Sequence, residues 1–184
     1  MNKKVKCLIY CTKAKPYLRN YPFDLTNSVF QLTDDSFNAL NGKIVAQFDC
    51  EKVEKFDVPY PAYFWEVKDE LEHITKGSCL SLMSLHHYLK NDSGYAIHIS
   101  NLEIFDEPKE LNDFKLFNPN YCLYTNIKKA PQNMCYVVKE IAMGFAPSEE
   151  YILISIRPEW VCKILNGEKT IEVRKSIVNK LKEI

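Results

Sequence analysis

The chain has 184 residues, of which 26% are charged and 46% hydrophobic, and its formal net charge is zero. These values suit one ordinary soluble domain with a hydrophobic core. No apolar run reaches the roughly 18 residues of a membrane span, and the apolar stretch near the N-terminus is too short for a signal peptide. We therefore expect one cytoplasmic domain over residues 1–184, without a membrane-embedded part.

Charge is distributed unevenly along this neutral chain. Residues 1–20 hold six Lys and Arg and no acidic residue, and residues 151–184 hold seven against four acids. Residues 21–150 hold 11 basic and 20 acidic residues. If the two ends meet in the fold, they form a basic face that suits phosphates. The alternative is an ordinary solvated surface.

The first half of the chain alternates strands with long insertions. The apolar run Val5–Cys11 predicts a buried strand. Residues 12–42 lack a clean period and form a loop insertion, with a short helix expected near 34–39. A turn then opens a strand over 43–53. Residues 57–77 form a second, acidic loop insertion, with room for one short helix.

The middle of the chain predicts one helix and two strands. Ser78 is the expected N-cap of a helix that runs to about Leu89. The clearest alternating pattern covers 95–105 and predicts a strand. Residues 108–131 look rich in loops, and 134–138 form a short strand.

The C-terminal part predicts a strand, a helix and a second strand. Residues 151–156 are an apolar strand, and Pro158 suits the first turn of a helix that Gly167 closes. Residues 170–174 alternate and predict a strand. Several strands with few short helices indicate an α+β fold of the small β-barrel kind.

Seven cysteines are scattered along the chain without a Cys-x2-Cys pair. The odd number and wide spacing argue against a disulfide framework and a structural zinc site. Buried thiols that act as small apolar residues explain them better. We expect no metal and no cofactor.

One short motif carries a family resemblance. Gly167, Lys169, Glu172 and Arg174 fit the pattern G-x-K-x-x-E-x-R, preceded by a strand and a short helix. This arrangement in 151–175 resembles the opening of an ASCH domain, a member of the PUA-like superfamily. The resemblance implies a PUA-like β-barrel with a cleft for RNA or a nucleotide-like ligand.

The order of the resembling segments is rotated. The family's motif normally opens the domain, whereas here it ends the chain. Residues 8–16, 42–48, 95–99 and 130–133 resemble later parts of the family, in that order. We therefore interpret the chain as a circularly permuted ASCH domain. The alternative is that 151–184 begins a second ASCH domain that is cut short.

The resemblance implies a cleft lined by the motif. Arg174 can fork onto a phosphate, Lys169 supplies a mobile charge, and Glu172 shares a strand face with Arg174. Permutation would bring the end of the first strand to the same place, and Gln132 can read a base edge. The expected ligand-binding residues are Lys169, Glu172, Arg174, Lys175, Thr12, Lys13, Lys15 and Gln132. An ordinary surface ion pair is the alternative for Glu172 and Arg174.

Aromatic and histidine side chains offer further contacts. Candidates for base stacking are Tyr10, Tyr95, Tyr124, Phe105 and Trp160. Trp160 faces the barrel from its predicted helix, so packing in the core is its expected role. His98 points outward from its strand if its apolar neighbours point inward.

Three classes of function stay open. The first is an RNA- or nucleotide-binding module. The second is a small hydrolase of amidohydrolase or ribonuclease type, with Lys169 and Glu172 as catalytic residues; the amidohydrolase branch has Thr where Glu172 stands, which counts against the same chemistry. The third is a protein-interaction adaptor that uses the acidic middle and the insertions 12–42 and 57–77.

Overall fold

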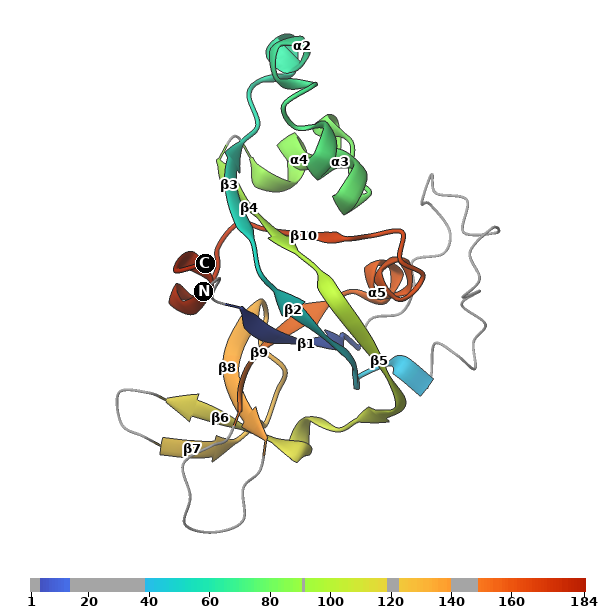
Figure 1. The fold of residues 1–184 in the computed structure, drawn as a ribbon, viewed down its shortest axis with the longest axis vertical. Coiled ribbons are helices and arrows are strands. Elements are labelled where there is room, and N and C mark those ends of the chain that lie inside the picture. Colours follow the sequence, from blue (N-terminus) through green and yellow to red (C-terminus); the bar gives the residue numbers. More distant parts are fainter. Residues whose placement is uncertain (1–3, 14–38, 91, 119–122, 140–148) are drawn as a thin grey trace.

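A computed structural model describes residues 4–13, 39–90, 92–118, 123–139 and 149–184. Figure 1 shows an α+β fold, as expected, with a mixed seven-stranded sheet, a three-stranded sheet and short helices. The helix expected near 34–39 lies almost wholly outside the described residues.

The seven-stranded sheet has the order β5-β2-β1-β9-β8-β6-β7. Its two central strands, β1 and β9, are parallel, and its other neighbouring strands are antiparallel. Both central strands are almost entirely buried, which explains their continuous apolar sequence. The strand bounds are β1 Val5–Cys11, β2 Ile44–Cys50, β5 Ser100–Lys109, β6 Phe114–Asn118, β7 Leu123–Asn126, β8 Met134–Lys139 and β9 Glu150–Ile156.

The three-stranded sheet has the order β10-β4-β3, with bounds Ile171–Arg174, Ser93–His98 and Val53–Asp57. A bent two-stranded ribbon joins the two sheets. One of its strands is β2 followed by β3, and the other is β4 followed by β5; β2 pairs with β5 in the large sheet, and β3 pairs with β4 in the small one. At the bend the His98 N–H donates to the Lys52 carbonyl at 3.1 Å, and Asn101 has a φ of 48°. The single strands expected over 43–53 and 95–105 are each two strands for this reason.

The expected closed barrel is wrong. Among the described strands, β5 and β7 form the two edges of the large sheet, and no pairing joins them. The two strands of the bent ribbon leave the large sheet and pair as β3 and β4 in the small sheet. They therefore do not extend the large sheet toward closure. The β6–β7 hairpin extends the opposite edge within 108–131, where we expected loops.

The helices are short and lie between the strands. The expected N-cap, Ser78, is wrong. Ser78 is the last residue of α3, and the helix that follows, α4, has Ser81 as its N-cap. The insertion 57–77 is more helical than expected. The helices are η2 Pro61–Tyr63, α2 Phe64–Val67, α3 Glu72–Ser78, α4 Leu82–Leu89, η3 Leu111–Asp113, α5 Pro158–Leu165 and α6 Asn179–Lys182.

The two ends of the chain meet, as expected. β9 pairs with β1, β10 pairs with β4, and Figure 1 shows the last helix of the chain close to the start of β1. Val5, Ile177 and Leu181 belong to one apolar cluster with the faces of β1, β2 and β9. The strand–helix–strand unit that carries the motif is therefore built into the same sheets as the rest of the described chain.

Candidate functional site

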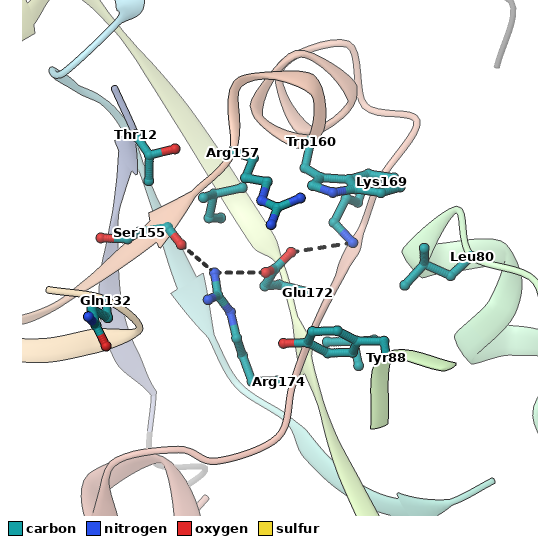
Figure 2. A pocket seen from close by; sticks show the side chains of 12 residues that line it. Thr12, Leu80, Tyr88, Gln132, Ser155, Arg157, Trp160, Lys169, Glu172 and Arg174 are labelled. Atoms are coloured by element: carbon teal, nitrogen blue, oxygen red, sulfur yellow. Dashed lines mark hydrogen bonds and ion pairs between the residues drawn. The ribbon is translucent and has the colours of Figure 1, made fainter. Parts of the chain in front are cut away.

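A cavity of about 500 Å³ lies where the carboxyl ends of β1 and β9 meet α5 and β10 (Figure 2). Thr12 directly follows β1, and Ser155 and Ile156 end β9, so the parallel pairing brings both strand ends to one place. This volume is in the range of small-molecule sites. The lining residues are Thr12, Leu80, Tyr88, Gln132, Ser155, Ile156, Arg157, Trp160, Lys169, Glu172, Val173 and Arg174.

The turn after α5 directs Lys169 into the protein. The backbone N–H groups of Glu168 and Lys169 both donate to the Lys163 carbonyl, at 2.9 and 3.0 Å. Gly167 has a φ of +75°, a conformation that favours glycine. This turn ends the helix and aligns Lys169 with the start of β10.

Lys169 is fixed rather than mobile, contrary to the expectation for a flexible lysine. Only 3% of its surface is exposed. Its Nζ donates to the Ser78 carbonyl at 3.0 Å and the Ile171 carbonyl at 2.7 Å, and lies 3.3 Å from Glu172 Oε2. An ammonium has three N–H donors, and three acceptors surround this one. Lys169 therefore ties α3 to β10 and holds one side of the Glu172 carboxylate.

Arg174 holds the other side of that carboxylate. Its Nη2 lies 2.8 Å from Glu172 Oε1 and donates to the Ser155 carbonyl at 2.6 Å. Its Nη1 donates to Asn133 Oδ1 at 3.1 Å. The guanidinium thus joins β10 to β9 and to the turn before β8, and it pairs with Glu172 across the face that the alternation predicted. Lys169, Glu172 and Arg174 form what we call the buried triad.

Two aromatic rings line the cavity beside the buried triad. Trp160 projects from α5, and Lys169 Nζ lies 5.2 Å from its ring centroid. Tyr88 projects from α4, and Lys175 Nζ lies 5.4 Å from its ring centroid. Desolvation raises the pKa of the Tyr88 phenol, with Arg174 opposing and Glu172 adding to the shift. The phenol therefore keeps its proton at neutral pH and can donate a hydrogen bond.

Trp160 serves both the core and the cavity. It packs against the large apolar cluster, as expected, but it also lines the cavity. Sequence analysis did not single out Tyr88 as a site residue, because in the sequence it fits the apolar pattern of its helix. In the structure 41% of Tyr88 is exposed.

Arg157 is the cation that sequence reasoning missed. It is exposed at the N-cap position of α5 and lines the cavity, and Figure 2 shows its guanidinium directed toward Glu172. It lies directly between the end of β9 and the start of α5. That position was a usable signal, because a residue between a buried strand and a helix reaches the edge of the sheet.

The remaining predicted site residues divide into two groups. Thr12 and Gln132 line the cavity together with the buried triad. Lys175 lies outside the lining, against the ring of Tyr88. Lys13 is exposed beside Gly42, away from the lining, and Lys15 lies outside the described residues.

The basic face expected from the charge distribution is partly neutralised. Lys4 pairs with Asp49 at 3.0 Å, Lys6 with Glu149 at 3.0 Å, and Lys180 with Glu150 at 2.8 Å. The ends of the chain do meet, but acids from the middle of the sequence face these lysines. The cavity itself is lined by three cations, Arg157, Lys169 and Arg174, and one carboxylate, Glu172.

His98 lies apart from the cavity in its own polar cluster. It contacts Glu54, which also pairs with Lys52 at 2.9 Å and with His73 at 3.2 Å. Partial burial opposes the charge on Glu54, but hydrogen bonds from Lys52, His98 and His73 outweigh it and lower the pKa to about 2. This cluster joins β3, β4 and α3 and is structural.

The described cysteines are free thiols, mostly buried. Burial raises the pKa of Cys11 to about 12 and those of Cys50 and Cys162 to about 11. They are uncharged at neutral pH and pack as small apolar residues. In the described part of the chain, His, Cys, Asp and Glu nowhere gather in a group of three that could hold a metal ion.

Comparison with known proteins gives no relative from which to borrow a role. No family model, curated protein or solved structure matches the chain. None of the helices in the described ranges is long and apolar enough to cross a membrane. The site must therefore be interpreted from its own chemistry.

Proposed function

We propose that the cavity binds a nucleotide, either free or as an exposed residue of single-stranded RNA. The observation that carries this proposal is the composition of one cavity of about 500 Å³. It combines an exposed arginine, two aromatic rings and a buried carboxylate. These groups suit a phosphate, a planar base and the polar edge of that base, respectively.

The resemblance to the ASCH family supports the same function. We propose that the chain is a circularly permuted ASCH domain with a PUA-like fold. Three of the four motif positions, Lys169, Glu172 and Arg174, line the cavity, and the fourth, Gly167, forms the turn before them. The pairing of β9 and β10 with earlier strands favours permutation over a second domain that is cut short.

The hydrolase alternative has less support. A lysine base or nucleophile needs a free lone pair, but the Nζ of Lys169 donates to two carbonyls and contacts Glu172. Glu172 is likewise held between two cations. We therefore assign the buried triad to shaping the cavity rather than to covalent chemistry.

Calorimetric titration with 5′-mononucleotides and short single-stranded RNA tests the proposal. Alanine at Lys169 or Arg174 would remove buried contacts, so the informative variants are Arg157→Ala and Tyr88→Leu. Loss of one phosphate contact should lower affinity and reduce the salt slope for single strands by about 0.7. Loss of a stacking ring should cost about 1–3 kcal/mol of binding free energy.

Lys128→Ala is the matched control for Arg157→Ala. Lys128 is exposed after β7 and outside the cavity lining, and its replacement removes the same single charge. It should leave affinity and salt slope close to those of the wild type. Equal effects of the two variants would mean nonspecific charge attraction, and absence of any nucleotide or RNA binding would reject the proposal.

The adaptor function is a second candidate, supported by a different surface. Tyr60, Tyr63 and Trp65 lie in η2 and α2 or at their start and are 62%, 53% and 75% exposed. Exposed aromatic rings in a short ordered segment are typical of protein-binding hot spots. In affinity capture from a cell extract, Trp65→Ser should lose bound protein without changing nucleotide affinity. If Trp65→Ser captures every protein that the wild type captures, this candidate fails.

A further inference from the structure

The buried carboxylate limits which base the cavity can hold. Only 7% of Glu172 is exposed, and one cation contacts each of its oxygens: Lys169 at Oε2 and Arg174 at Oε1. A carboxylate has about four lone-pair positions and no donor. The protein therefore uses about half of them and leaves one acceptor position on each oxygen.

Most of the other polar groups at this end of the cavity are engaged by protein partners. The Nζ of Lys169 is engaged by the Ser78 and Ile171 carbonyls as well as by Glu172. The two Nη atoms of Arg174 donate to Ser155 and Asn133 and contact Glu172. Within the described residues, Arg174 Nε is buried without a hydrogen-bond partner. This end therefore offers a ligand two acceptors on a fixed carboxylate and one donor beside them.

Such a pair of acceptors matches the edge of one common base. Guanine carries two parallel donors, the N1–H and the 2-amino group, which can bond to both oxygens of a carboxylate. Adenine and cytosine place a ring-nitrogen acceptor beside their single amino group, and uracil places carbonyl oxygens on both sides of its N3–H. These acceptors would face the carboxylate and be repelled.

The surrounding rings place a base against this edge. Figure 2 shows Trp160 entering from α5 and Tyr88 from α4, with the Glu172 carboxylate between them. A base stacked on either ring can present its edge to Glu172, and Arg157 remains for the phosphate. Lys169 and Arg174 hold the Glu172 carboxylate in place, so a poorly matched base cannot rotate it away. This rigidity favours discrimination between bases.

We propose that the cavity selects guanine through the two oxygens of Glu172. This inference rests on the proposed function and narrows its ligand to a guanosine nucleotide, free or within RNA. The selectivity comes from one bidentate contact, which should favour 5′-GMP over AMP, CMP and UMP by about 10-fold or more.

Calorimetric titration of the wild-type protein with five mononucleotides tests the inference. Inosine 5′-monophosphate is the sharpest probe, because it keeps the N1–H of guanine and lacks only the 2-amino group. We expect the affinity order GMP, then inosine monophosphate, then the other three. The pentanucleotide 5′-UUGUU-3′, with 5′-UUAUU-3′ as the control that lacks guanine, distinguishes a base within RNA from a free nucleotide. Tighter binding of 5′-UUGUU-3′ than of free GMP assigns the site to RNA, and tighter binding of free GMP assigns it to the free nucleotide.

Glu172→Gln replaces one acceptor by a donor and should bring GMP within about threefold of AMP; circular dichroism and thermal melting check that the variant is folded. Should it not fold, the wild-type comparison of GMP with inosine monophosphate decides alone. Equal affinity for all five nucleotides, or preference for another base, would overturn guanine selection and leave nucleotide binding standing. Failure of every nucleotide and RNA to bind would overturn both.

Discussion

Lys169→Met is the substitution whose effect on stability the structure defines most closely. Methionine keeps the length of the lysine stem but leaves the Ser78 and Ile171 carbonyls without their donor and Glu172 with one cation fewer. Breaking a buried ion pair by removing one partner costs about 3–5 kcal/mol, and each unsatisfied buried acceptor costs about 1–3 kcal/mol. Because Arg174 still neutralises Glu172, we expect about 3 kcal/mol in total.

Urea unfolding followed by circular dichroism measures this loss. With a urea dependence of about 2 kcal/mol per molar, the unfolding midpoint should fall by about 1.5 M. Lys76→Met is the matched control, because the Lys76 side chain is 75% exposed and pairs with Glu72 within the same helix. This control should unfold at nearly the wild-type midpoint.

A double-mutant cycle separates the ion pair from the packing of the lysine stem. Adding Glu172→Gln to Lys169→Met removes the carboxylate that has lost one of its two cations, so the double variant should be more stable than the sum of the single effects predicts, by about 0.5–3 kcal/mol. If Lys169→Met is as stable as Lys76→Met, or the two substitutions are simply additive, Lys169 is not a buried partner of Glu172.

Three further predictions concern the polar cluster on β3 and two glycines. The pKa of Glu54 is lowered from its usual 4.5 to about 2, so its charge stabilises the fold above pH 4.5 and this contribution is lost as the pH falls toward 2. The free-energy difference between wild type and Glu54→Gln should therefore shrink over that range, and a constant difference would contradict the assignment. Gly167→Ala should cost about 1 kcal/mol in urea unfolding, because Gly167 has a φ of +75° and nothing lies within 4 Å of an added methyl group. Gly77→Ala should cost more, about 1–3 kcal/mol, because its methyl group would lie 2.7 Å from Ile171 Cδ1; a smaller loss than for Gly167→Ala would show that β10 can shift away from α3.

Local pattern was sufficient to predict the elements around the site. The apolar runs of β1 and β9, the proline at the start of α5 and the alternation in β10 all correspond to the observed structure. In that alternation Ile171 and Val173 share one parity, and both lie in the core, where they are 4% and 5% exposed. These features depend on neighbouring residues only, which is why the sequence alone predicts them.

The features that depend on distant contacts were not predictable in this way. At the bend that splits 95–105 into β4 and β5, the apolar positions change parity, from Ile97 and Ile99 to Leu102 and Ile104. This change indicates an irregularity in the strand, but not which strands pair on either side of it. The immobility of Lys169 depends on the Ser78 carbonyl, 91 residues away in sequence. The β7 strand of the β6–β7 hairpin is wholly exposed and mixed in composition, so its sequence resembles a loop.

The central claim is that one cavity, lined by the buried triad, Arg157, Trp160 and Tyr88, binds a nucleotide. Backbone chemical-shift mapping of the ¹⁵N-labelled protein during titration with 5′-GMP tests it most directly. The account predicts that the largest changes fall on Arg157, on 169–174 and on the end of β9, with the β6–β7 hairpin unchanged. Saturating nucleotide that shifts no amide around the cavity, or shifts only amides elsewhere, would contradict it.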